Sequence, residues 1–407
     1  MKNVALYYDI KGIPINMIFE LSGALKTDEE REIFENKYEQ IYKSCLRSLI
    51  HSPSLRLTKL SGPSIFFFYK KVKYENKQGN LSHKKILLLG ERHNVTKPCR
   101  PHVDFVKGEY DIHSYLIALG EMLDEKNDRE NGSESLDIFV EEDYRLNRKS
   151  QKEEVRLFCK SLEDCNNPLE SIRIVMKNSE FYPNSIRWHY VDTRSTKYPE
   201  RLHDDFMIQM YDELQKKPSI HSIIQHILKF YDTNKLVMYL VGLKPEYIDY
   251  YLDFCNNLNS RVSPHKHKRN EIQLLIKKHE EEVMVPLIKK RIEKADMSAK
   301  EVTKLLESLV SATQSHKAPY NGLLTCRMDA YTLLRMFTVF DKNVTSKNNV
   351  PKNIILHAGA THTVIIKEAL KLFTYPHMDI MAGDIRVFSN PLSTQCIELK
   401  EPFNYFQ

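Results

Sequence analysis

The sequence has few of the residues that mark several common classes of protein. It contains one Trp, 12 Gly and seven Cys in 407 residues, and 28% of the residues are charged. The odd number of cysteines and the absence of a Cys-X-X-Cys pair argue against a disulfide framework and against a cysteine zinc site. The scarcity of glycine argues against a fibrous or low-complexity chain. We therefore expect a globular protein with reduced thiols.

Long apolar runs and a strong charge of one sign are also missing. No segment approaches the roughly 18 apolar residues of a membrane-spanning helix, and the N-terminal residues lack the uninterrupted apolar region of a signal peptide. The formal net charge is only +6, and the basic run at 265–269 is interpreted as an exposed loop, so no nucleic-acid partner is indicated. The sequence predicts an intracellular, cytoplasmic protein without a membrane span.

Strand and helix patterns alternate over much of the chain. The aromatic segment at 64–75, the turn NKQGN and the apolar run up to Gly90 predict a hairpin. An amphipathic helix is expected at 111–125, and a final edge strand at 377–388. Alternating strands and helices favour an α/β fold, with a mostly parallel central sheet flanked by helices.

A nearly all-helical stretch interrupts this pattern before the last core helix and strand. We therefore expect three parts in the chain. They are an N-terminal mixed segment at 1–60, an α/β core formed by 61–198 and 316–407, and an all-helical insertion at 199–315.

Ionisable residues follow four of the predicted strands. Ligands bind outside the carboxyl ends of parallel strands, and ionisable groups buried there need partners or a ligand. The sequence therefore predicts a site at this edge of the sheet. The strands are Ile86–Gly90, followed by Glu91, Arg92 and His93; Ile138–Val140, followed by Glu141, Glu142 and Asp143; His189–Val191, followed by Asp192 and Arg194; and Ile354–His357, followed by Ala358 to His362.

Local geometry suggests how two of these strand ends are built. Gly90 and Gly359 are expected to let the chain turn sharply out of the sheet. Thr361 is the expected N-cap of the following helix, which places His362 in its first turn. The helix dipole disfavours a protonated imidazole there, and a neutral imidazole can act as a general base or a metal ligand.

The residues around the first and last of these strands resemble a known family. Gly90-Glu91-Arg92-His93 and Gly359-Ala360-Thr361-His362 are two Gly-X-X-His motifs, and this pair resembles the TIKI/TraB superfamily, which includes erythromycin esterase-like and ChaN-like proteins. The segment IFVEED resembles the acid-bearing second strand of the family. CRMDAYTLLRMF resembles a helix that carries a functional Arg, here Arg327. Asp329 stands where the family pattern often has Asn.

The resemblance implies a hydrolase that cleaves an ester or peptide bond in a small-molecule or peptide substrate. In a metal-dependent form, a divalent ion of the Mn or Co type would lower the pKa of a bound water. In a metal-free form, His93 or Glu91 would take a proton from water, and Arg92 or Arg327 would stabilise the oxyanion. The implied catalytic residues are Glu91, His93, Arg327 and His362; the implied metal ligands are His93, Glu141 and His362; the implied supporting residues are Gly90, Arg92, Asp143, Asp192, Arg194 and Gly359.

Several alternatives stay open at this stage. Glu141 and Glu142 point to opposite faces of a strand, so only one is expected to face the site, and Glu141 is favoured. His189 and His357 are expected to be buried structural residues. An ion pair between Asp192 and Arg194 would serve structure instead of chemistry. The alternative functions are a non-catalytic haem- or metal-binding protein on the same fold, and an interaction protein that works through the helical insertion.

Overall fold

The computed structural model describes residues 55–61, 66–91, 107–143, 183–192, 285–315, 322–341, 348–373, 380–382 and 396–406. Its larger sheet has six strands in the spatial order β6-β5-β7-β3-β2-β8. Strands β6, β5, β7 and β3 pair in parallel, and β2 is antiparallel to both β3 and β8. The expected α/β fold with a mostly parallel sheet is confirmed. The strands are β2 (Phe66–Glu75), β3 (Leu81–Glu91), β5 (Leu136–Asp143), β6 (Ile186–Asp192), β7 (Asn353–Gly359) and β8 (Ile380–Ala382).

The predicted hairpin is formed by β2 and β3. The Asn76 side chain accepts hydrogen bonds from the backbone N–H groups of Gln78 at 3.0 Å and Asn80 at 2.9 Å. Gly79 has a φ of +76°, a left-handed conformation that glycine adopts without a steric penalty. Asparagine and glycine at these positions therefore favour the turn through local interactions, and the Lys77 N–H also donates a hydrogen bond to the carbonyl oxygen of Asp296 at 2.8 Å.

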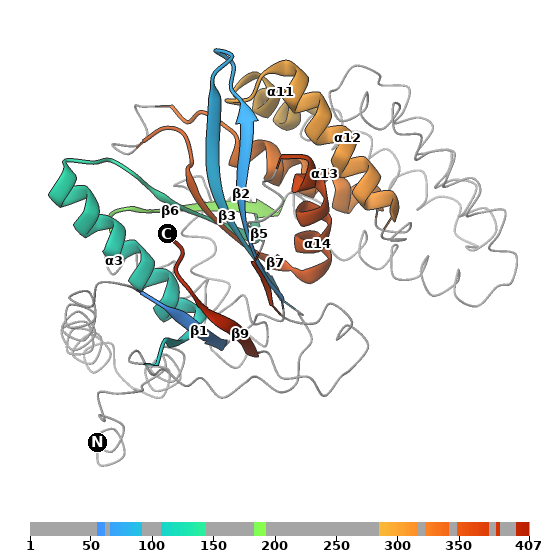
Figure 1. Ribbon diagram of the computed structural model, residues 1–407. Coiled ribbons are helices and arrows are strands. Elements are labelled where there is room, and N and C mark those ends of the chain that lie inside the picture. The colour runs from blue at the N-terminus through green and yellow to red at the C-terminus, as the bar shows by residue number, and fades with distance from the viewer. Residues whose placement is uncertain are drawn as a thin grey trace, which may run out of the picture.

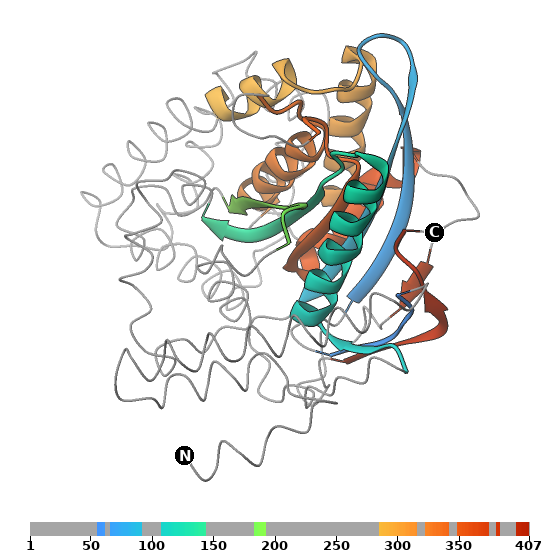
Figure 2. The same cartoon turned by 90° about the vertical axis from the view of Figure 1, so that its left-hand side faces the viewer.

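Helices cover both faces of the sheet (Figure 1), as the view turned by 90° also shows (Figure 2). One face packs against α3, and the other packs against the remaining described helices. Every residue of β7 is buried, as expected for a central parallel strand covered on both sides. The helices are α3 (Ile112–Glu130), α11 (Val285–Glu293), α12 (Ala299–Ser315), α13 (Gly322–Met336), α14 (Ala360–Ala369) and the 3₁₀ helix η8 (Leu370–Phe373).

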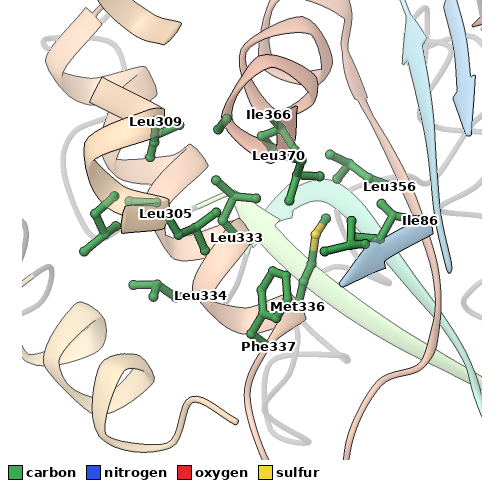
Figure 3. Close-up of a cluster of buried hydrophobic side chains, with 14 of the residues drawn as sticks. Ile86, Leu305, Leu309, Leu333, Leu334, Met336, Phe337, Leu356, Ile366 and Leu370 are labelled. Atoms are coloured by element: carbon green, nitrogen blue, oxygen red, sulfur yellow. The ribbon is translucent and has the colours of Figure 1, made fainter. Parts of the chain in front are cut away.

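Side chains from three helices meet the sheet in one apolar cluster (Figure 3). Leu305 and Leu309 of α12 lie in the same cluster as Leu333 of α13 and Leu356 of β7, and all are fully buried. Helices α11 and α12 fall within the segment 199–315 that was expected to be an insertion. Its last part therefore packs as core, because the apolar faces of these helices contact α13 and α14. The rest of that segment, up to residue 284, lies outside the described residues.

A second, three-stranded sheet lies beside α3. Its order is β4-β1-β9, with β1 (Leu57–Ser61) parallel to β4 (Glu109–Asp111) and antiparallel to β9 (Cys396–Phe403). Tyr405, just after β9, donates a hydrogen bond to the carbonyl oxygen of Ile354 at 3.0 Å. The C-terminal residues are thus joined to the central strand β7. The predicted boundary between residues 60 and 61 falls inside β1. In the described ranges, no helix is both long and apolar enough to cross a membrane.

The packing of α12 can be tested with one pair of variants. We expect Leu305→Ala to lower the free energy of unfolding by about 2–5 kcal/mol, because it removes buried methyl groups and leaves a cavity. The matched control is Leu372→Ala, at a position that is 56% exposed, where we expect a change within about 0.5 kcal/mol. Denaturant unfolding measures both. Equal effects of the two substitutions would show that α12 is not part of the core.

Candidate functional site

The junction between β7 and α14 carries the second Gly-X-X-His motif. Helix α14 begins at Ala360, and its N-cap is Gly359, with φ −51°, ψ 141° and no side-chain capping bond. The prediction of Thr361 as N-cap is therefore wrong. The Glu141 carboxylate, from the neighbouring strand β5, accepts a hydrogen bond from the Gly359 N–H at 2.6 Å. A contact between residues so far apart in the chain has no local sequence signal.

The expected role of the two motif glycines also differs from the structure. Gly359 has a negative φ, and Gly90 continues strand β3. Among the described glycines, only Gly79 and Gly108 have positive φ. The sharp turn out of the sheet is therefore made without the left-handed conformation that was expected at Gly359.

His362 lies between two carboxylates from different elements. Its Nδ1 is 2.7 Å from Oδ1 of Asp329 in α13, and its Nε2 is 3.5 Å from Oε1 of Glu141 in β5. All three side chains are buried, with exposed fractions of 5% or less. The structure therefore brings together Glu141 and His362, two of the predicted site residues, and adds Asp329 (Asp329, Glu141 and His362 are called the His362 centre below).

Glu91 belongs to a separate pair on the opposite face of the sheet. Its Oε2 is 3.5 Å from Nε2 of His357, and both side chains are buried. Side chains alternate between the faces of a strand. Glu91 lies two residues after Leu89, which packs on the α3 side. Glu141 lies two residues after Phe139, which packs on the side of the other helices. Among the described residues, Glu91 is thus separated from Glu141 and His362, because the acids at the ends of β3 and β5 fall on opposite sides of the pleat.

The structure describes only some of the other predicted site residues. Arg92, His93 and Arg194 lie outside the described residues, so the expected Asp192–Arg194 ion pair does too. The side chains of Arg327, Glu142 and Asp143 also lie outside them, although their backbones belong to α13 and β5. Asp192 ends β6, is half-buried, and stands opposite Asp143 in the strand register.

Sequence reasoning missed two partners. The sequence singled out Asp329 only as a departure from a family pattern. Its position within an otherwise apolar helical segment could have indicated a partner, because a buried acid needs one. His357 was expected to be structural, and it is fully buried beside Glu91. Neither partnership has a sequence spacing that would reveal it.

The predicted metal ligands are only partly present among the described residues. Glu141 and His362 are close enough to share an ion, and a carboxylate on the second ring nitrogen is a common feature of metal-binding histidines. Within the described ranges, no group of three or more His, Cys, Asp or Glu side chains is placed to hold a metal. The third predicted ligand, His93, lies outside them.

Comparison with known proteins adds no relative to this picture. No family model, curated protein or solved structure matches the chain. The resemblance to the TIKI/TraB superfamily therefore rests on the motifs and strand contexts in the sequence.

A second buried polar cluster surrounds His189 in β6. Its Nε2 is 2.7 Å from Oδ1 of Asp137, and its Nδ1 is 3.3 Å from a guanidinium nitrogen of Arg335. The ring stacks between Phe139 and Phe340, with centroid distances of 4.3 and 4.9 Å. Because a guanidinium only donates hydrogen bonds, Nδ1 is the acceptor and Nε2–H donates to Asp137. His189 is therefore neutral, and it is buried as expected.

The charges around this cluster explain its protonation. Burial lowers the pKa of His189 to about 3, the positive charge of Arg335 adds to this effect, and the hydrogen bond with Asp137 opposes it. Burial acts to raise the pKa of Asp137, but the hydrogen bond from His189 and the hydrogen bond and positive charge of Arg187 outweigh it and lower this pKa to about 2. These contacts hold β5, β6 and α13 together, which is a structural role.

Lys84 is another buried ionisable group, and its contacts are structural. Its ammonium group donates a hydrogen bond to the carbonyl oxygen of Pro351, and it lies 5.4 Å from the ring centre of Tyr74 and 5.2 Å from that of Phe337. Burial lowers the pKa of Lys84 to about 7. The aromatic rings and the carbonyl partly offset the cost of placing an amine in the core.

The Glu91–His357 contact predicts an energetic coupling. In a double-mutant cycle with Glu91→Gln and His357→Gln, we expect a coupling of about 0.5–3 kcal/mol in the free energy of unfolding, as for residues in contact. The control cycle combines Glu91→Gln with His362→Gln, on the other face of the sheet, and its coupling should be within about 0.5 kcal/mol. A larger coupling in the control cycle would mean that Glu91 and His362 share one centre.

The His189 cluster predicts a loss of stability in acid. The pKa of His189 is about 3 in the folded protein and about 6.5 in an unfolded chain. Between about pH 3 and pH 6.5, His189 therefore binds a proton in the unfolded chain but not in the folded one. The free energy of unfolding falls as the pH decreases from about 6.5 to 3. We expect His189→Gln to be less stable near neutral pH but to lose stability less steeply over this range.

Denaturant unfolding at a series of pH values measures this effect. His83→Gln is the matched control, since His83 is exposed on β3. This substitution should leave the dependence of stability on pH unchanged. If the wild-type chain and His189→Gln lost stability equally steeply, the neutral state assigned to His189 would be wrong.

Proposed function

We propose that the chain is a hydrolase that cleaves an ester or peptide bond in a small-molecule or peptide substrate, with Glu141 and His362 as its acid–base pair. The observation that supports this proposal is the buried imidazole of His362, 3.5 Å from the Glu141 carboxylate. The pair lies at the carboxyl end of the central strand β7, the edge at which open α/β sheets bind their ligands.

Hydrolysis needs a group that takes a proton from the attacking water and returns one to the leaving group. An imidazole beside a carboxylate can do both. His362 also lies in the first turn of α14, where backbone N–H groups favour the negative charge that develops on the substrate oxygen. In this proposal Arg327 supplies a further positive charge, and His93, two residues beyond the end of β3, contributes from the first motif.

A metal-dependent form of the same activity is the second candidate. The distance of 3.5 Å between Nε2 of His362 and Oε1 of Glu141 is longer than a hydrogen bond. It is close to the separation of about 3.4 Å between two ligands of one tetrahedral ion with bonds of about 2.1 Å. A divalent ion of the Mn or Co type would be held by His362, Glu141 and His93, and would supply an activated water.

The proposal predicts a loss of turnover in two variants. On a panel of chromogenic esters and fluorogenic peptides, we expect His362→Ala and Glu141→Gln to lower kcat/KM by about 10²- to 10⁴-fold, the usual contribution of a general acid or base. His83→Ala, at an exposed histidine, is the control and should keep full activity. Circular dichroism would establish that each variant is folded.

Two outcomes would contradict the proposal. Full activity of a chain that carries both His362→Ala and Glu141→Gln, on any substrate that the wild-type chain cleaves, would remove the pair from the mechanism. A wild-type chain that cleaves nothing in the panel, with and without added Mn²⁺ or Co²⁺, but carries a tightly bound chromophore would favour the non-catalytic binding protein. Metal analysis of the purified chain, followed by activity with and without a chelator, separates the two hydrolytic forms.

A further inference from the structure

Asp329 makes the shortest contact in the His362 centre. Its Oδ1 lies 2.7 Å from Nδ1 of His362, a normal hydrogen-bond distance for a charged acceptor, whereas Nε2 is 3.5 Å from Glu141. Asp329 is fully buried. A carboxylate is not buried at this position without a partner of matching chemistry, and the imidazole supplies one.

The chemistry of the two groups fixes where one proton lies. An ionised carboxylate only accepts hydrogen bonds, so the nitrogen that faces it must carry the hydrogen. With Asp329 ionised, Nδ1 of His362 therefore carries the hydrogen, and Nε2 is the nitrogen directed toward Glu141. With Asn in place of Asp329, the same contact would allow either arrangement, because an amide can donate as well as accept.

The helix that carries Asp329 is itself held in place. Arg335, further along α13, donates hydrogen bonds to the Tyr331 hydroxyl at 3.2 Å and to Nδ1 of His189 at 3.3 Å. His189 belongs to β6, so α13 is tied to the sheet that also carries Glu141. A side chain on an anchored helix can orient its partner to the accuracy that proton transfer requires.

We infer that Asp329 is a positioning residue: by accepting the hydrogen bond from Nδ1–H, it sets the tautomer and orientation of His362 so that Nε2 faces Glu141. This inference deepens the proposed function and rests on it for its catalytic consequence. Its structural content, the protonated nitrogen of one histidine, can be measured without a substrate.

The experiment is nitrogen NMR of the full chain with selectively ¹⁵N-labelled histidine. The His362 signals are assigned from their absence in His362→Gln, and ¹⁵N shifts distinguish a protonated ring nitrogen from an unprotonated one. In the wild-type chain we expect Nδ1 to be protonated. In Asp329→Asn, which keeps the size of the side chain, we expect this preference to be reduced or lost.

The control is Asp341→Asn, at an exposed acid whose partner is Lys294. This variant also removes one negative charge but should leave the His362 signals unchanged. An unprotonated Nδ1 in the wild-type chain would overturn the inference without any variant. Unchanged His362 signals in a folded Asp329→Asn chain would overturn it as well.

The activity of the same variants separates this inference from the proposed function. On a substrate that the wild-type chain cleaves, Asp329→Asn should lower kcat by about 10- to 100-fold, as loss of an orienting hydrogen bond commonly does, and Asp341→Asn should not. If the NMR result is as expected but the wild-type chain hydrolyses nothing, the hydrolase proposal fails and the role of Asp329 stands. If Asp329→Asn loses the Nδ1 preference but keeps full kcat, Asp329 has no positioning role in catalysis.

Discussion

The complete burial of β7 is the constraint on which the candidate site depends. Each of its residues is covered, and polar groups in such a position must be bonded within the protein. His357 lies beside Glu91, the Gly359 N–H donates to Glu141, and the Asn353 amide is 3.4 Å from oxygens of Glu134 and Ser135. The acids Glu141 and Glu91 of the neighbouring strands thus lie next to polar groups of the buried central strand.

The sheet separates these contacts by face. Parallel strands in register bring the ends of β5, β7 and β3 to one edge, but the pleat sends successive side chains to opposite sides. Glu141 therefore lies on the side of α13 and α14, beside His362, which in turn contacts Asp329. Glu91 lies on the side of α3. Among the described residues, this edge of the sheet holds two buried acid–imidazole pairs, and the pair with His362 lies at the N-terminus of α14.

The two buried histidines on the α13 side of the sheet have different neighbours. The His189 cluster has a guanidinium on one ring nitrogen and a carboxylate on the other, so its imidazole is held neutral and serves to join elements. His362 instead has a carboxylate near each ring nitrogen. Two buried histidines of similar exposure thus differ in character because their neighbours differ.

The sequence by itself determined the local features. The alternation of apolar runs predicted the parallel sheet and its edge strand, NKQGN predicted the hairpin turn, and the strand ends predicted where ionisable groups gather. These features depend on residues that are neighbours in the chain, whose propensities act without the rest of the fold. The burial of His189 was predictable for the same reason.

Only the tertiary structure decided which acid meets which histidine. Asp329 and His362 are 33 residues apart, and Glu141 and Gly359 are 218 apart, so no spacing rule relates them. The face on which each acid lies follows from the parity of the pleat and from the helix that covers that face. The N-cap of α14 is Gly359 instead of Thr361, and the carboxylate that binds its N–H comes from another strand. Such contacts exist only after the strands have paired, which is why the sequence could place these side chains at strand ends but could not pair them.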